Sequence, residues 1–138
     1  MASKRILVVE DNLGDQLLIE EIFNGRDPDL ELLFFADGQE ALSYLESLER
    51  GEADFMADLI TLDINLPKVD GFGLLAFIKN AQRLKSIPVV IFSTSSYYLD
   101  KRKAMELGAD AFITKPSSFS DYRTVLHDLY ESKFGAPS

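Results

Sequence analysis

Six charged or hydroxyl side chains lie at, or directly after, the ends of short apolar runs. They are Glu10, Asp11, Asp63, Ser93, Thr94 and Lys115. Three clustered carboxylates repel each other and need a cation, and ligands that offer only oxygen favour Mg²⁺ or Mn²⁺. A lysine and a hydroxyl beside such an ion suit the remaining oxygens of a phosphoryl group. These residue types therefore indicate phosphate chemistry, in which an aspartate can accept the phosphoryl group as a nucleophile.

The apolar runs predict strands that alternate with helices. A short run such as Leu59–Leu62 is typical of a strand buried on both faces of a parallel sheet. Strands are expected at about 5–9, 30–36, 58–63, 87–92 and 110–114, with helices at about 14–24, after Asp37, at 71–83, 99–107 and from Ser118. This alternation predicts an α/β fold with helices on both faces of the sheet and right-handed crossovers. The carboxyl ends of the strands, where the polar side chains lie, would then meet at one edge.

Composition limits the other possibilities. The 138 residues carry 23 acidic and 14 basic side chains, and this net charge of −9 argues against direct nucleic-acid binding. The absence of cysteine excludes disulfides, thiolate metal sites and cysteine catalysis. No apolar run approaches the roughly 20 residues that cross a bilayer, and we expect a cytoplasmic protein without membrane contact. The length suggests one domain over residues 1–138, with its core at about 4–133 and no effector domain.

At these residues the sequence resembles the receiver domains of two-component response regulators. The matching residues are Glu10-Asp11, Asp63, Leu66-Pro67, Asp70-Gly71, Ser93 and Lys115-Pro116. The spacings fit as well, with 30 residues from Asp63 to Ser93 and 22 from Ser93 to Lys115. The resemblance implies a flavodoxin-like (βα)5 fold, doubly wound, with a five-stranded parallel sheet in the order 2-1-3-4-5.

The resemblance also implies roles for the acidic residues and the lysine. Asp11, Asp63 and the backbone carbonyl of Asn65 would hold Mg²⁺, with Glu10 acting directly or through water. Asp63 would be the phosphoacceptor that attacks a phosphohistidine on a partner histidine kinase. Mg²⁺ and Lys115 would stabilise the charge on the transferring group. The chain would thus take part in its own phosphorylation without being an enzyme.

A conformational switch is expected at Ser93 and Phe112. By the resemblance, Ser93 would hydrogen-bond the new acyl phosphate, and Phe112 would turn into the space that Ser93 leaves. Phe112 lacks the hydroxyl of the tyrosine often found at this place. Thr94 would line the access to the site. The resemblance further implies a cis Lys115-Pro116 bond, although X-Pro bonds in general are seldom cis.

Two other functions would use some of the same residues. An aspartate-dependent phosphatase would need a second carboxylate two residues after Asp63, where this chain has Asn65. A receiver-shaped binding module that acts without phosphorylation would be suggested by loss of the acceptor or the lysine, and both are present. The binding module that acts without phosphorylation is therefore kept as the alternative to a phosphoryl-accepting receiver.

Partners are indicated only in outline. The segment Leu66–Gly71 and the overall pattern look similar to single-domain regulators that serve phytochrome-type histidine kinases. Output would go through a downstream phosphotransfer or effector protein. Aromatic residues gather near the last two predicted helices, and we expect most of them to be at least half-buried; they are Tyr97, Tyr98, Phe119, Tyr122 and Tyr130. In receivers the surface of helix four, strand five and helix five often forms dimers, which makes a homodimer a hypothesis here.

Overall fold

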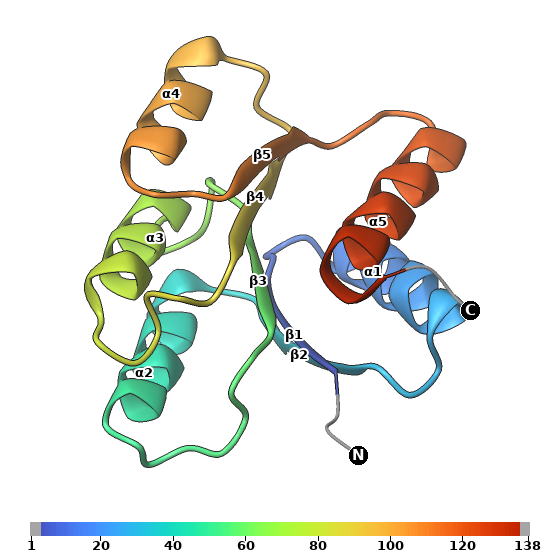
Figure 1. Cartoon of the computed structure of the whole chain (residues 1–138). Helices are drawn as coiled ribbons and strands as arrows, with labels where there is room; N and C mark the ends of the chain where they lie inside the picture. Colours follow the sequence, from blue (N-terminus) through green and yellow to red (C-terminus); the bar gives the residue numbers. More distant parts are fainter. Residues whose placement is uncertain (1–3, 136–138) are drawn as a thin grey trace.

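The computed structural model describes residues 4–135 and contains five strands that alternate with five helices (Figure 1). The first three and last three residues of the predicted 1–138 domain lie outside the described part. The strands are β1 (Arg5–Val9), β2 (Glu31–Phe35), β3 (Leu59–Leu62), β4 (Val89–Ser93) and β5 (Ala111–Thr114). The helices are α1 (Leu13–Arg26), α2 (Gly38–Glu49), α3 (Gly71–Asn80), α4 (Tyr98–Glu106) and α5 (Phe119–Phe134).

All strands are parallel and form one sheet in the order β2-β1-β3-β4-β5. This confirms the flavodoxin-like (βα)5 fold expected from the sequence. The pairing register fixes which strand ends are neighbours. Val9 pairs with Leu62, so Glu10 and Asp63 leave the sheet side by side.

The sheet separates two apolar cores because its strands present buried side chains to both faces. Helices α2, α3 and α4 cover one face, and α1 and α5 cover the other (Figure 1). Leu45, Leu75 and Ala104 are fully buried on the first face. Phe23 and Leu126 are buried on the second. Three of the five strands are buried along nearly their whole length, which explains their uninterrupted apolar sequence.

Polar side chains cap four of the helices. Asp37, Asp70 and Ser118 each accept a hydrogen bond from the backbone N–H three residues later, as their sequence context predicts. Asn12 does the same for α1 by accepting from the N–H of Asp15 at 2.9 Å. The Asn12 cap fixes the start of α1 directly after Glu10 and Asp11.

Gly71 allows a close approach between the start of α3 and the end of β3. A Cβ atom at this position would lie 2.2 Å from the carbonyl oxygen of Asp63, which is far inside contact distance. The Gly71 N–H donates to the carbonyl of Ile64 at 2.9 Å. Only glycine fits here, so the Asp70-Gly71 pair holds the backbone that follows Asp63.

Lys4, directly before β1, is tied to α5. Its Nζ donates to the Tyr130 hydroxyl at 3.0 Å, and that hydroxyl donates to Asp27 Oδ2 at 2.6 Å. The hydrogen bond from Tyr130, followed by that from the N–H of Asp29, holds the pKa of Asp27 below its ordinary value against the effect of burial. The bonds join β1, the end of α1 and the end of α5 at the amino edge of the sheet.

Three expectations need correction. Tyr97, Tyr98 and Phe119 are 55%, 69% and 53% exposed, whereas Tyr122 and Tyr130 are buried as expected. Helical spacing shows which residues share a face of a helix, but it does not show whether another element covers that face. Tyr97 and Tyr98 lie at the start of α4 and Phe119 at the start of α5, where their side chains remain exposed. The described chain has no cis peptide bond, so Lys115-Pro116 is trans, the isomer that X-Pro bonds ordinarily prefer. Helix α3 ends at Asn80 rather than near residue 83.

No helix within residues 4–135 is both long and apolar enough to cross a membrane.

Candidate functional site

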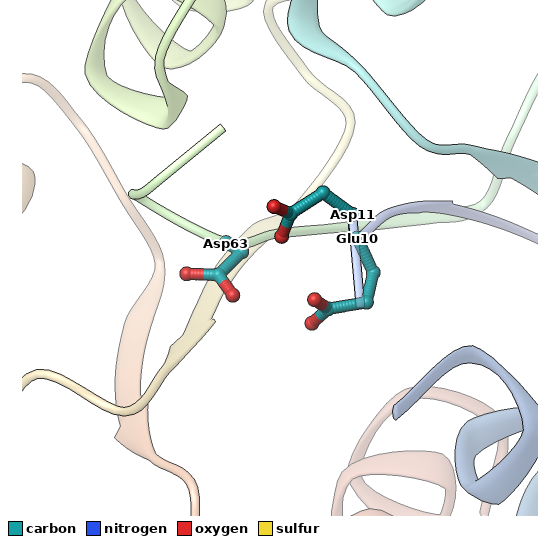
Figure 2. A group of neighbouring side chains, drawn as sticks. All are labelled: Glu10, Asp11 and Asp63. Atoms are coloured by element: carbon teal, nitrogen blue, oxygen red, sulfur yellow. The ribbon is translucent and has the colours of Figure 1, made fainter. Parts of the chain in front are cut away.

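Three carboxylates converge at the carboxyl edge of the sheet (Figure 2). Each of Glu10, Asp11 and Asp63 offers an oxygen that lies within 4.8 Å of the others. The backbone brings them together because the Asp63 N–H donates to the carbonyl of Val9 at 3.0 Å, which continues the ladder between β1 and β3. Glu10 and Asp63 are buried, while Asp11 is exposed. The cluster is therefore open to solvent on the side of Asp11.

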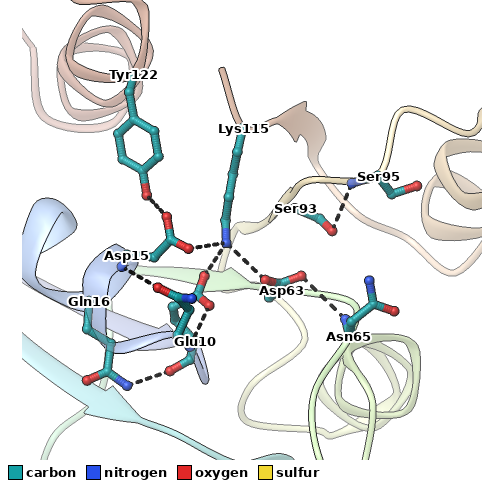
Figure 3. A network of polar contacts seen from close by, with 10 residues as sticks. Glu10, Asp15, Gln16, Asp63, Asn65, Ser93, Ser95, Lys115 and Tyr122 are labelled. Atoms are coloured by element: carbon teal, nitrogen blue, oxygen red, sulfur yellow. Dashed lines mark hydrogen bonds and ion pairs between the residues drawn. The ribbon is translucent and has the colours of Figure 1, made fainter. Parts of the chain in front are cut away.

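Lys115 reaches this cluster from the end of β5 (Figure 3). Its Nζ lies 2.5 Å from Glu10 Oε1, 3.0 Å from Asp63 Oδ2 and 3.2 Å from Asp15 Oδ2. The side chain of Lys115 is only 4% exposed. Its backbone N–H donates to the carbonyl of Ser93 at 2.7 Å, so the strand pairing of β4 and β5 fixes where the side chain begins. The ammonium is a buried cation with a carboxylate on each available N–H.

Burial and charge shape the ionisation of this site. Burial raises the pKa of Glu10 to about 7, although hydrogen bonds from Lys115 and from the N–H of Asn12 favour the charged form. Burial alone would lower the pKa of Lys115, but the hydrogen bond and charge of Glu10 and the charge of Asp63 raise it above its ordinary value. Lys115 therefore carries its charge throughout the neutral range.

The cluster fits a divalent metal ion. Glu10, Asp11 and Asp63 supply oxygen ligands only, and one ammonium leaves their combined charge negative. A second positive group would favour the charged form of Glu10, whose burial otherwise disfavours it. Hard cations of the Mg²⁺ and Mn²⁺ type match these ligands.

The remaining predicted site residues surround Asp63. The Asn65 N–H donates to Asp63 Oδ1 at 3.3 Å, so Asn65 lies in direct contact with the side chain of Asp63. Ser93 is fully buried at the end of β4, and its Oγ accepts from the N–H of Ser95 at 3.3 Å (Figure 3). Thr94 is exposed beside it. Phe112, one strand further out on β5, is half-buried against the core.

Asp15 and Tyr122 were not singled out from the sequence as site residues. Asp15 Oδ2 contacts Lys115, and the Tyr122 hydroxyl donates to Asp15 Oδ1 at 2.7 Å (Figure 3). Burial, followed by the hydrogen bond and charge of Asp15, raises the pKa of Tyr122, so the hydroxyl keeps its proton. A signal for Asp15 did exist, because it lies one helical turn after Asp11 and helical side chains point back toward the amino end.

A comparison with known protein families decides the relationship. Residues 6–127 match the response regulator receiver domain. The chain belongs to this family. The family places it in two-component signalling, in which receivers act with histidine kinases.

Individual relatives agree with this. The chain is 38% identical to response regulator Rcp1 of Synechocystis sp. over 118 residues, which cover 86% of this chain and 80% of Rcp1. It is 35% identical to the probable methanogenesis regulatory protein FilR2 of Methanothrix harundinacea, over 94% of this chain and 83% of that protein.

Solved structures give the same result. The crystal structure of the phosphorylated cyanobacterial phytochrome response regulator RcpA has a TM-score of 0.88 at 35% identity, and the match covers 99% of this chain and 98% of RcpA. The Mn²⁺-bound form of Rcp1 has a TM-score of 0.85 at 32% identity, with 97% of each chain covered. The receiver fold expected from the sequence is confirmed along nearly the whole chain.

Proposed function

We propose that this chain acts as a receiver that accepts a phosphoryl group on Asp63. The observation that supports this is the meeting of Asp63 with two further carboxylates and a buried lysine at one edge of the sheet. Each of these groups has a use in phosphoryl transfer, and none contributes to an apolar core. The chain takes up one phosphoryl group and loses it slowly, and it turns over no other substrate.

The transfer is a displacement at phosphorus. An oxygen of the Asp63 carboxylate attacks the phosphorus of a phosphohistidine on the kinase. The P–N bond breaks, its electrons return to the imidazole ring, and that ring takes a proton from water. An acyl phosphate remains on Asp63. Lys115, 3.0 Å from Asp63 Oδ2, stabilises the negative charge that spreads over the transferring oxygens.

Mg²⁺ is the proposed cofactor. Glu10, Asp11, Asp63 and the backbone carbonyl of Asn65 would hold it, with Glu10 binding directly or through water. When bound, the ion neutralises charge on the phosphoryl oxygens. The open side at Asp11 leaves room for the phosphodonor. The Mn²⁺-bound structure of Rcp1 supports a divalent ion in this family.

The signal is proposed to leave the site through Ser93 and Phe112. Ser93 Oγ accepts a weak hydrogen bond from the Ser95 N–H and can exchange it for a bond to the acyl phosphate. Phe112 would then turn inward, with Thr94 at the entrance. Crystal structures with and without a phosphoryl mimic test this, and the same Phe112 rotamer in both would contradict it.

Partners are proposed from the relatives and from the surface. RcpA is a cyanobacterial phytochrome response regulator, which supports a phytochrome-type histidine kinase as the donor. The output would be a downstream phosphotransfer or effector protein, or a homodimer through α4, β5 and α5. Tyr97, Tyr98 and Met105 expose apolar surface on α4 and its approach, and Phe119 does so on α5. Light scattering that finds only the monomer mass, before and after phosphorylation, would contradict the dimer.

Intact-mass spectrometry with acetyl phosphate tests the central proposal. We expect the mass to rise by one phosphoryl group with Mg²⁺, to stay unchanged with chelator, and to stay unchanged in Asp63→Asn. A gain that survives in Asp63→Asn would show that another residue is the acceptor. No gain from acetyl phosphate or from a panel of phosphorylated kinases would favour the binding module that acts without phosphate.

A further inference from the structure

Asp15 completes the set of partners around the Lys115 ammonium. An ammonium has three N–H donors. Glu10 Oε1, Asp63 Oδ2 and Asp15 Oδ2 lie 2.5, 3.0 and 3.2 Å from Nζ, so each donor has one carboxylate acceptor. Two of these acceptors, Glu10 and Asp15, are not the proposed acceptor of the phosphoryl group. With two donors held by fixed acceptors, the direction of the third is set toward Asp63.

Tyr122 in turn fixes Asp15. Its hydroxyl donates to Asp15 Oδ1 at 2.7 Å, which leaves Oδ2 to face Lys115. Tyr122 is 4% exposed, and its ring packs edge-on against Phe92, with ring centroids 5.2 Å apart. A buried ring in such packing has little freedom to move. The hydroxyl is thus a fixed donor that holds one oxygen of the carboxylate.

We propose that Asp15 and Tyr122 are positioning residues for Lys115 in phosphoryl transfer. Tyr122 holds Asp15, and Asp15, with Glu10, holds the ammonium so that its third N–H faces the Asp63 carboxylate. This inference rests on the proposed function. After transfer, the third N–H turns to an oxygen of the phosphoryl group, while the bonds to Glu10 and Asp15 stay.

Position and charge predict opposite effects of removing Asp15. The carboxylate of Asp15 adds negative charge to a site that must admit an anionic phosphodonor. If its charge alone mattered, Asp15→Asn would speed phosphorylation. If it positions Lys115, Asp15→Asn slows phosphorylation. Tyr122→Phe changes no charge, so any slowing in that variant reflects position.

The experiment follows phosphorylation by acetyl phosphate with saturating Mg²⁺, using intact-mass spectrometry at several donor concentrations. We expect the limiting rate to fall about 10-fold in Asp15→Asn and in Tyr122→Phe, which is the lower end for loss of a group that orients an active-site residue. The Mg²⁺ affinity, measured by calorimetry, and the donor concentration at half-maximal rate stay at wild-type values. This separation distinguishes positioning from a general loss of structure.

Two control variants match the changes. Asp121→Asn removes one exposed carboxylate from the first turn of α5 without touching Lys115. Tyr130→Phe removes a hydroxyl from another buried tyrosine of α5, whose partners Lys4 and Asp27 lie at the opposite edge of the sheet. Both controls should keep the wild-type limiting rate.

A Lys115→Met background completes the test. If Asp15 and Tyr122 act through Lys115, neither substitution slows the residual rate further in that background. A wild-type or faster rate in Asp15→Asn, or a 10-fold further loss without Lys115, would overturn the inference. Failure of the proposed function would differ, because the wild-type protein itself would then gain no phosphoryl group from acetyl phosphate or a kinase.

Discussion

Replacing Lys115 by methionine tests whether the buried cation holds the acidic edge together. Methionine keeps an apolar chain of similar size but removes the ammonium. The side chains of Lys115, Glu10 and Asp63 are 4%, 2% and 9% exposed, so the carboxylates would lose a partner that solvent replaces poorly. Removing one partner of a buried ion pair costs about 3–5 kcal/mol. Because Asp15 is 21% exposed and Glu10 can take up a proton, we expect about 3 kcal/mol at about pH 8.

The loss should depend on pH in a definite direction. Burial raises the pKa of Glu10 to about 7 from an ordinary value near 4.5, and loss of the Lys115 ammonium would raise it further. Between these two values the folded protein binds a proton that the unfolded chain has released, so stability falls as pH rises. The destabilisation by Lys115→Met should therefore be smaller at about pH 6 than at about pH 8.

Urea unfolding followed by circular dichroism, in chelator and in saturating Mg²⁺, measures these differences. Mg²⁺ should stabilise the variant more than the wild type, because the ion replaces the missing positive charge. Lys101→Met, on the exposed surface of α4, is the matched control and should stay within about 0.5 kcal/mol of wild type. If Lys115→Met is equally close to wild type in chelator at about pH 8, the reasoning from buried charge is wrong.

Three further predictions concern single contacts. Gly71→Ala should destabilise the fold by about 2 kcal/mol in urea unfolding, because its Cβ would overlap the Asp63 carbonyl oxygen. Asp27→Asn should cost about 1 kcal/mol at neutral pH. Tyr130 lowers the pKa of Asp27, so this contribution is complete above the ordinary pKa of aspartate and is lost as pH falls through the lowered value. Asp11→Asn should weaken Mg²⁺ binding at least about 10-fold in calorimetry and leave stability in chelator unchanged or higher, because Asp11 is an exposed member of the carboxylate cluster.

Each of these three predictions has an outcome that would contradict it, and two of them have a matched control variant. Gly25→Ala, on α1 with no atom within 4 Å of the new Cβ, should not destabilise, and an equal loss in both glycine variants would contradict the close-approach argument. Asp128→Asn, exposed on α5, should show no matching acid dependence; a constant difference between Asp27→Asn and wild type down to about pH 3 would exclude the proposed linkage. Unchanged Mg²⁺ affinity in Asp11→Asn would remove Asp11 from the ligand set.

The sequence was sufficient for the fold and for the meeting of Asp63, Glu10 and Lys115. Each follows an apolar run, and parallel strands place their carboxyl ends at one edge whatever the details of packing. Helix starts at Asp37 and Ser118 could also be predicted, because a cap depends on residues only three apart.

Contacts that depend on packing between helices could not be predicted. The bond between Asp15 and Tyr122 requires a particular placement of α1 against α5 and particular side-chain rotamers, neither of which periodicity encodes. The expectation that most of the aromatic residues are at least half-buried was wrong for a related reason. Spacing groups Phe119 with the apolar side chains of α5, but whether another element covers the first turn is a property of the whole fold.

The bonds that join Lys4 to Tyr130 have a practical consequence for protein engineering. Lys4 lies directly before β1 and Tyr130 in the last turns of α5, so both described ends of the chain come together at the amino edge of the sheet. A five-residue strand spans about 17 Å, which separates that edge from Glu10 and Asp63. A fluorescent protein or affinity tag fused after α5 would thus lie away from the carboxylates. A circular permutant that links the two ends by a short loop should preserve the sheet, and new ends opened in the polar segment around Gly51 would keep all four strand pairings.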